Sequence, residues 1–163
     1  MKLNFRIKHH FFSAFREFFV HHHSSLTFRA KLFALVISAN KKAKVDNYIA
    51  VKDIGMKIYK DDEERANLLM LSTKELVQKV KDNNGLDIDT LVANIQKELR
   101  IIPRFAKKID IDALRKILDF THDRDTISYQ ENILEFLERL KDETLHTRKE
   151  QIIQDEEELD SLK

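Results

Sequence analysis

Residues 120–131, FTHDRDTISYQE, hold the side chains of this chain that are best suited to acid–base or metal chemistry. A histidine, three carboxylates and several hydroxyls stand here between two apolar segments. Three kinds of site use such residues: a calcium loop, the His-Asp pair of a metal-dependent phosphohydrolase, or a polar connection between two helices. A calcium loop needs oxygen ligands at alternate positions. With Glu131 as its last ligand, two of these positions fall on His122 and Arg124, so the calcium loop is rejected.

We interpret this segment as a polar connection between helices. Asp125, Thr126 or Ser128 would cap the following helix, and the negative charge of Glu131 would support its first turn. The metal alternative is a looser site formed by Asp123, Asp125 and Glu131. The phosphohydrolase interpretation is rejected because those enzymes need further histidine ligands, and the chain has none between its N-terminal histidines and this segment.

The rest of the sequence gathers no catalytic side chains. The chain has no cysteine, which excludes disulfides, thiolate catalysis and cysteine-ligated metal sites. A glycine-rich phosphate loop, a nucleophile elbow and a two-histidine zinc helix are also absent from the sequence. We therefore expect a protein that is not an enzyme and that binds no cofactor.

The N-terminal segment, residues 1–24, carries aromatic residues at helical spacing. Phe11, Phe15, Phe18 and Phe19 fall on one face of an amphipathic helix. Three interpretations of this face are open. It lies on a membrane surface, it docks in a groove of a partner protein, or it packs on the chain's own core or on a second copy.

Charge is distributed unevenly along the chain. Residues 1–60 hold 12 Lys or Arg against 3 acids, whereas residues 109–163 hold 8 against 16. We expect Lys41, Lys42 and Lys44 in the basic part to attract an acidic partner surface. Nucleic acid is not the expected partner, because no DNA-reading or RNA-stacking motif accompanies the lysines. The alternative is that the basic and acidic ends attract each other, within one chain or between two chains.

Composition and periodicity predict an all-α fold of six to eight helices. Two glycines and one proline are too few for the many turns of a β-rich fold. Residues 32–39 are apolar on nearly all sides, so we expect them to form a central buried helix. We expect residues 25–145 to form the helical domain and residues 146–163 to form an acidic tail, either helical or frayed. Apolar residues recur at one heptad position across this boundary, namely Leu145, Ile152 and Leu159.

Several helix boundaries are also predicted. Asp46 is the expected N-cap of one helix, and Asp87 or Asp89 is the expected N-cap of another. The sequence NNG at residues 83–85 predicts a turn before the latter helix. Between these elements, a break near Ser72 would divide one long apolar-periodic segment into two short helices.

A faint repeat relates residues 31–58 to residues 113–140, with an offset of 82 residues. Each copy reads as a helix, a short polar loop, a β-branched residue and a second helix. The β-branched residue is Val45 in the first copy and Ile127 in the second. This pattern predicts two pseudo-repeated helical hairpins.

This arrangement, over roughly residues 28–142, resembles the TerB-like family. That family comprises tellurite-resistance-associated helical domains and is similar to the N-terminal region of DjlA-type DnaJ-like proteins. Its loops follow an approximate Asp-Gly-x-Ile/Val-Ser/Asp-x-x-Glu pattern. The matching residues are Val45 and Asp46 in the first loop, and Ile127, Ser128 and Glu131 in the second. The resemblance implies a helical fold and a role in a bacterial stress response.

The same resemblance implies metal binding by acidic residues of the loops, but the leading Asp of the pattern is replaced by Lys42 and by Arg124. A cation at these positions opposes a divalent ion. We therefore expect a non-catalytic interaction or scaffold domain in the cytoplasm. It would bind a protein partner or form a homo-oligomer. The alternative is a peripheral membrane protein that uses the aromatic N-terminal helix.

Overall fold

The computed structural model describes residues 24–163, and its elements over this range are all helical. The described residues form six α-helices and two short 3₁₀ helices. In chain order they are α2 (Ser24–Ser38), α3 (Val45–Ile58), α4 (Glu63–Lys81), α5 (Ile88–Ile101), η1 (Pro103–Lys108), α6 (Ile111–Arg115), η2 (Lys116–Phe120) and α7 (Arg124–Ser161). This confirms the predicted all-α class. Over residues 24–163, none of the helices combines the length and the apolar character that crossing a membrane requires.

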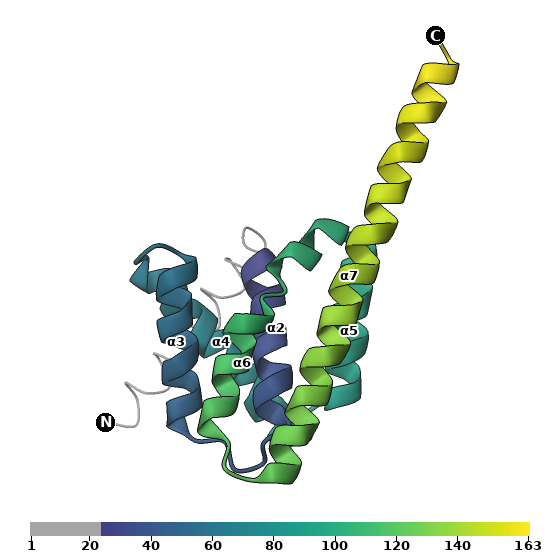
Figure 1. Cartoon of the computed structure of the whole chain (residues 1–163). Coiled ribbons are helices and arrows are strands. Elements are labelled where there is room, and N and C mark those ends of the chain that lie inside the picture. The colour runs from purple at the N-terminus through teal and green to yellow at the C-terminus, as the bar shows by residue number, and fades with distance from the viewer. Residues whose placement is uncertain (1–23) are drawn as a thin grey trace.

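Helix α2 lies at the centre of the bundle, as its all-round apolar sequence predicts (Figure 1). Residues 32–37 are all buried, with exposed fractions of 3% or less. Helices α4, α5, α6 and α7 and the short helix η1 all pack against α2. Other helices surround α2. If α2 had a polar stripe along one side, those polar groups would be buried in the core, so its sequence is apolar on nearly all sides.

The other helices lie on the two sides of α2. Helices α3 and α4 pack together on one side, and α5 and α7 lie on the other (Figure 1). Gly55 allows α3 to lie close to α4, because a Cβ atom at Gly55 would be 3.1 Å from Cα of Ala66. Helix α3 contacts mainly α4 and η2. The first copy of the predicted repeat, residues 31–58, is therefore not a hairpin in which α3 folds onto α2.

Four helices begin after an aspartate whose carboxylate accepts a hydrogen bond from the backbone N–H three residues later. These aspartates are Asp62, Asp87, Asp110 and Asp123. Of the two predicted N-caps for α5, Asp87 and Asp89, the structure has Asp87, whose carboxylate oxygen Oδ1 lies 2.7 Å from the backbone nitrogen of Thr90. The prediction for Asp46 is wrong. Helix α3 begins at Val45, and Asp46 lies in its first turn.

The predicted break near Ser72 is also wrong, since α4 is a single helix from Glu63 to Lys81. Ser72 and Thr73 are buried in its middle, and the Thr73 hydroxyl donates to the carbonyl of Leu69 at 2.8 Å. The hydroxyl thus finds its partner within the helix and does not interrupt it. The predicted turn at residues 83–85 is confirmed, with positive φ angles at Asn83 and Gly85.

Helix α7 has 38 residues and is about 57 Å long. Its first half packs on the bundle, and its second half extends well beyond the other helices (Figure 1). The helix runs without interruption through the predicted boundary at residue 145, so the acidic tail is helical. Every residue from Lys149 onward is exposed.

Candidate functional site

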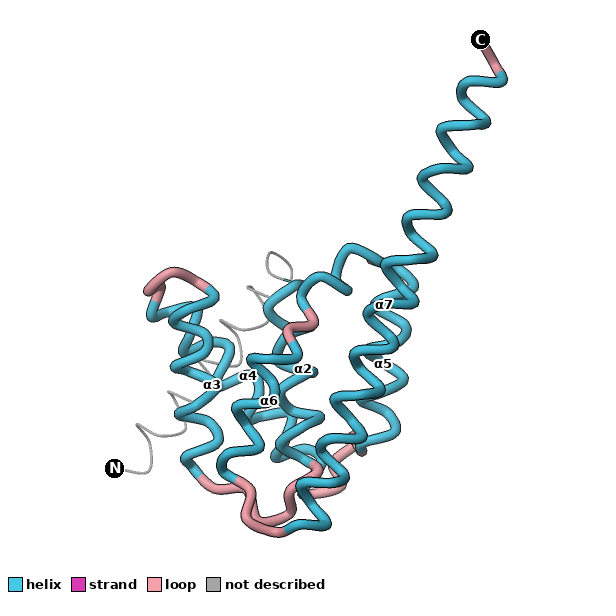
Figure 2. The backbone as a smooth tube through the Cα atoms, in the orientation of Figure 1, coloured by secondary structure: helices cyan, strands magenta, loops and turns pink. Residues whose placement is uncertain are grey.

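Two loops meet at one end of the bundle (Figure 2). The first, residues 39–44, joins α2 to α3, and the second, residues 121–123, joins η2 to α7. The side-chain amide of Asn40 donates to the hydroxyl of Thr121 at 3.4 Å, and both residues are buried. The backbone N–H of Lys42 donates to the same Asn40 side chain at 3.0 Å. The loops that precede α3 and α7 therefore lie in contact, whereas the residues that match the family pattern lie in the first turns of these two helices.

Asp123 is the N-cap of α7, which corrects the prediction that Asp125, Thr126 or Ser128 has this role. One carboxylate oxygen of Asp123 accepts from the Thr126 hydroxyl at 2.7 Å and from the Thr126 backbone N–H at 3.0 Å. These bonds, the hydroxyl first, lower the pKa of Asp123, and the charge of Lys42 adds to the effect. The carboxylate is thus held in its ionised form by its own helix.

Glu131 pairs with Arg115, and this corrects its predicted role in the first turn of α7. Both carboxylate oxygens lie 2.7 Å from Nη1 of Arg115, on helix α6. Asp125 is exposed in the first turn of α7. Among residues 24–163, no three His, Asp or Glu side chains are gathered in a way that could hold a metal ion. The structure therefore does not bring Asp123, Asp125 and Glu131 together as ligands.

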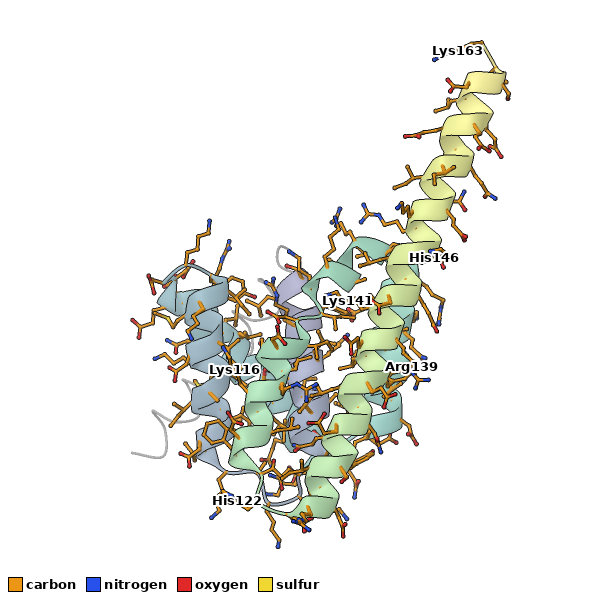
Figure 3. The ribbon with its side chains drawn as sticks, viewed as in Figure 1. Lys116, His122, Arg139, Lys141, His146 and Lys163 are labelled. Carbon is orange, nitrogen blue, oxygen red and sulfur yellow. The ribbon has the colours of Figure 1, made fainter. Side chains whose placement is uncertain are left out.

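The predicted basic residues lie at this end of the bundle. Lys41, Lys42 and Lys44 are all exposed around the first loop. Phe11, Phe15, Phe18 and Phe19 lie outside the described residues, so their role as a docking face stays a prediction. His122, also exposed, lies in the second loop at the same end (Figure 3).

A groove of about 430 Å³ lies beside these loops, between α3 and η2. Its lining residues are Asp46, Ile49, Ala50, Asp53, Ile54, Lys57, Lys116, Asp119 and Phe120. Ile49 is 50% exposed and Phe120 is 37% exposed, although both are large and apolar. Val45, one helical turn before Ile49, is 67% exposed. We call Val45, Ile49 and Phe120 the apolar strip.

Charged residues border the apolar strip. Asp46 and Asp53 stand on α3 and Asp119 stands on η2, so acids flank the groove from both helices. Lys57 and Lys116 add two positive charges, and Figure 3 shows Lys116 on the side of η2 that faces α3. An apolar floor with charged edges of both signs is typical of a surface that binds a protein segment in one orientation.

The sequence alone did not indicate this groove. Ile49 and Phe120 are 71 positions apart in the chain, and Phe120 stands at the edge of the segment that suggested metal chemistry. A helical-wheel count of α3 would have placed Val45 and Ile49 on one face, because residues four apart are neighbours on a helix. The sequence near α3 does not show that η2 covers this face of α3 only in part.

No protein-family description, no curated protein and no solved structure matches the chain. The resemblance to the TerB-like family therefore rests on the sequence pattern alone and stays a prediction.

Proposed function

We propose that the chain is a non-catalytic interaction domain that binds a helical segment of a partner protein in the α3–η2 groove. The apolar strip carries the proposal. Ile49 and Phe120, 50% and 37% exposed, line the groove, and Val45, 67% exposed, stands one helical turn before Ile49. A groove between two helices accepts an amphipathic helix, whose apolar residues at i, i+3 or i+4, and i+7 fill it.

The charges around the groove define the chemistry of the partner. Lys41, Lys42 and Lys44 lie at one end of the apolar strip, immediately before Val45. A partner helix with an acidic end would place that end at the lysines and its apolar face on Ile49. The lysines would chiefly increase the association rate, whereas burial of the apolar strip would slow dissociation.

The family assignment and the cellular setting are part of the proposal. The sequence resemblance supports a TerB-like fold, and the two loops next to its pattern contact each other through Asn40 and Thr121. We propose on this basis a cytoplasmic protein of a bacterial stress response. Lys42 stands where that family's pattern has Asp, and its charge acts on Asp123 in the facing loop. The two loops would thus be joined by the hydrogen bond from Asn40 to Thr121 and by the attraction between Lys42 and Asp123, without an ion.

The test compares variants of one surface with a matched variant elsewhere. Ile49→Asp changes the groove, and Ile101→Asp changes an apolar residue that is 67% exposed at the end of α5. Partners captured by the parent chain are identified, purified and titrated against both variants by calorimetry. We expect the Ile49→Asp variant to lose at least about tenfold in affinity. The Ile101→Asp variant should bind like the parent, and circular dichroism checks that both are folded.

The proposal is wrong if every identified partner binds the Ile49→Asp variant as tightly as it binds the parent. Lys41→Glu with Lys42→Glu gives a second test. This pair should weaken binding at low salt and have less effect at high salt, because salt screens exposed charges. A salt-independent loss would contradict the electrostatic part of the proposal.

A second candidate function is attachment to an anionic membrane surface. The exposed lysines beside Val45 favour it, and it would use the aromatic face predicted for residues 1–24. Co-sedimentation with vesicles that contain anionic lipid distinguishes the two functions. Binding that is retained in Ile49→Asp and lost in Phe15→Asp would support the membrane. A lack of vesicle binding by the parent chain would remove this candidate.

A further inference from the structure

The second half of α7 extends away from the bundle, and three of its four exposed large apolar residues lie towards one side, with Ile153, 46% exposed, as the exception. It leaves the bundle near His146 and ends near Lys163 (Figure 3). Ile152, Leu159 and Leu162 are 47%, 62% and 82% exposed. Their spacing of seven and three residues places them along one side of the helix. We call residues 146–163 the α7 extension.

Charge divides the α7 extension into two parts on either side of Ile152. Arg148 and Lys149 stand three and four residues before Ile152, and Asp155 and Glu156 stand three and four residues after it. Three further acids follow, at positions 157, 158 and 160. The helix is thus basic near the bundle and acidic towards its tip.

This division is complementary to itself when two copies run in opposite directions. In an antiparallel pair centred on Ile152, Arg148 and Lys149 of one copy lie level with Glu156 and Asp155 of the second copy. Leu159 of one copy also comes level with Leu145 of the second copy, a side chain that is partly buried against its own core. A parallel pair would instead place the acidic tips side by side, where like charges repel.

A groove at the base of the α7 extension is placed to receive the tip of the second copy. It has a volume of about 520 Å³ and lies between α5, η1 and α7. Leu99, Pro103 and Leu140 supply apolar lining, and Arg100, Arg148 and Glu143 supply two positive charges and one negative charge. In the antiparallel pair, Leu159 and Leu162 of the second copy lie level with residues 145 and 142, beside this groove. The acids of the tip then lie near the two arginines.

We propose that the α7 extension pairs antiparallel with that of a second copy of this chain, and that each tip lies in the basal groove of the other copy. The two copies are related by a two-fold axis near Ile152, so each contact occurs twice. This surface is separate from the α3–η2 groove, and the inference does not depend on the proposed function.

The first test measures the dimerisation constant of the full chain by sedimentation equilibrium. Arg148→Glu with Lys149→Glu places acids opposite Asp155 and Glu156 of the second copy, and Asp155→Lys with Glu156→Lys places lysines opposite Arg148 and Lys149. All four residues lie at the surface of α7, so both variants should fold. We expect each variant alone to raise the dissociation constant at least about tenfold.

Two combinations provide the controls. An equimolar mixture of the acidic and basic variants should form a heterodimer, because every opposed pair is then complementary. A chain with all four charges exchanged should dimerise like the parent. A parent chain that stays monomeric at all concentrations would overturn the proposal. So would a dimer that neither double variant weakens.

Orientation is measured separately with a single spin label. The chain has no cysteine, so Ser161→Cys gives one labelling site near the tip. Ser161 is nine residues from Ile152, so the labels in an antiparallel dimer would be separated by about 27 Å along the helix axis. A parallel pair would hold them about 10 Å apart and would refute the proposed arrangement. Dimerisation should be unchanged in Ile49→Asp, so this proposal and the proposed function can fail independently.

Discussion

Gln130 is the residue through which α7 is hydrogen-bonded to the central helix. It is completely buried, and its side-chain amide donates to the carbonyl of Val36 at 3.0 Å. Val36 lies in the last turn of α2, where carbonyl groups have no partner within the helix. The two residues are 94 positions apart, so this single bond joins distant parts of the chain. We predict that removing the amide destabilises the whole domain.

Two substitutions at this position separate the hydrogen bond from the packing. Gln130→Met keeps most of the side-chain volume and leaves the Val36 carbonyl buried without its donor. It also removes Oε1, which is buried without a partner, so the net cost should lie at the low end of the usual range. An unsatisfied buried polar group costs about 1–3 kcal/mol. Gln130→Ala removes the donor and also leaves a cavity, so its total cost should be about 2–5 kcal/mol.

Urea unfolding followed by far-ultraviolet circular dichroism measures these costs. Gln154→Met is the matched control, because Gln154 lies on the exposed part of the same helix. Its free energy of unfolding should stay within about 0.5 kcal/mol of the parent value. If Gln130→Met also stays within that limit, the bond to Val36 does not stabilise the domain and the reasoning is refuted.

Two further predictions concern the bundle and the loops. Gly55→Ala gains helix propensity, but its methyl group presses against Ala66. We expect the free energy of unfolding, measured by urea unfolding, to fall by about 1 kcal/mol. A stabilised variant would contradict this. Asp123→Asn should lower stability at neutral pH, because the pKa of Asp123 is lowered in the folded chain and the ionised cap stabilises it above the ordinary value of 3.8. This contribution is lost as the pH falls through the lowered pKa, so the parent and the variant should converge in acid. Asp125→Asn is the control, and a difference that persists in strong acid would contradict the assignment of Asp123 as the ionised cap.

The parts of the fold that the sequence predicted depend on local patterns. Residues 32–37 are buried because they are apolar on every side, which leaves a helix no alternative to the centre of the bundle. Asp87 follows a turn with positive φ angles at Asn83 and Gly85, so the start of α5 is marked twice in the sequence. Neither feature requires knowledge of a distant contact.

The predictions for Asp46 and Ser72 failed within single helices, whereas other incorrect predictions depend on contacts between distant residues. Four polar residues between 123 and 128 are suitable caps, and the choice of Asp123 depends on where Thr121 is held by Asn40. Glu131 pairs with Arg115, which lies 16 positions earlier on another helix. The turn after α3 uses positive φ angles at Lys60 and Asp61, where no glycine marks a turn.

The two proposed surfaces lie at opposite ends of the bundle, and this has a measurable consequence. The α3–η2 groove adjoins the loop end, whereas the α7 extension leaves from the other end (Figure 1). A dimer formed through the α7 extensions would therefore carry its two grooves far apart and facing outward. Such a dimer would bind a partner with two acidic helices more tightly than one with a single helix when the linker between those helices spans the two grooves. Arg148→Glu with Lys149→Glu should remove this advantage and leave the affinity for a single helix unchanged. An equal loss for both kinds of partner would mean that the α7 extension itself contacts the partner.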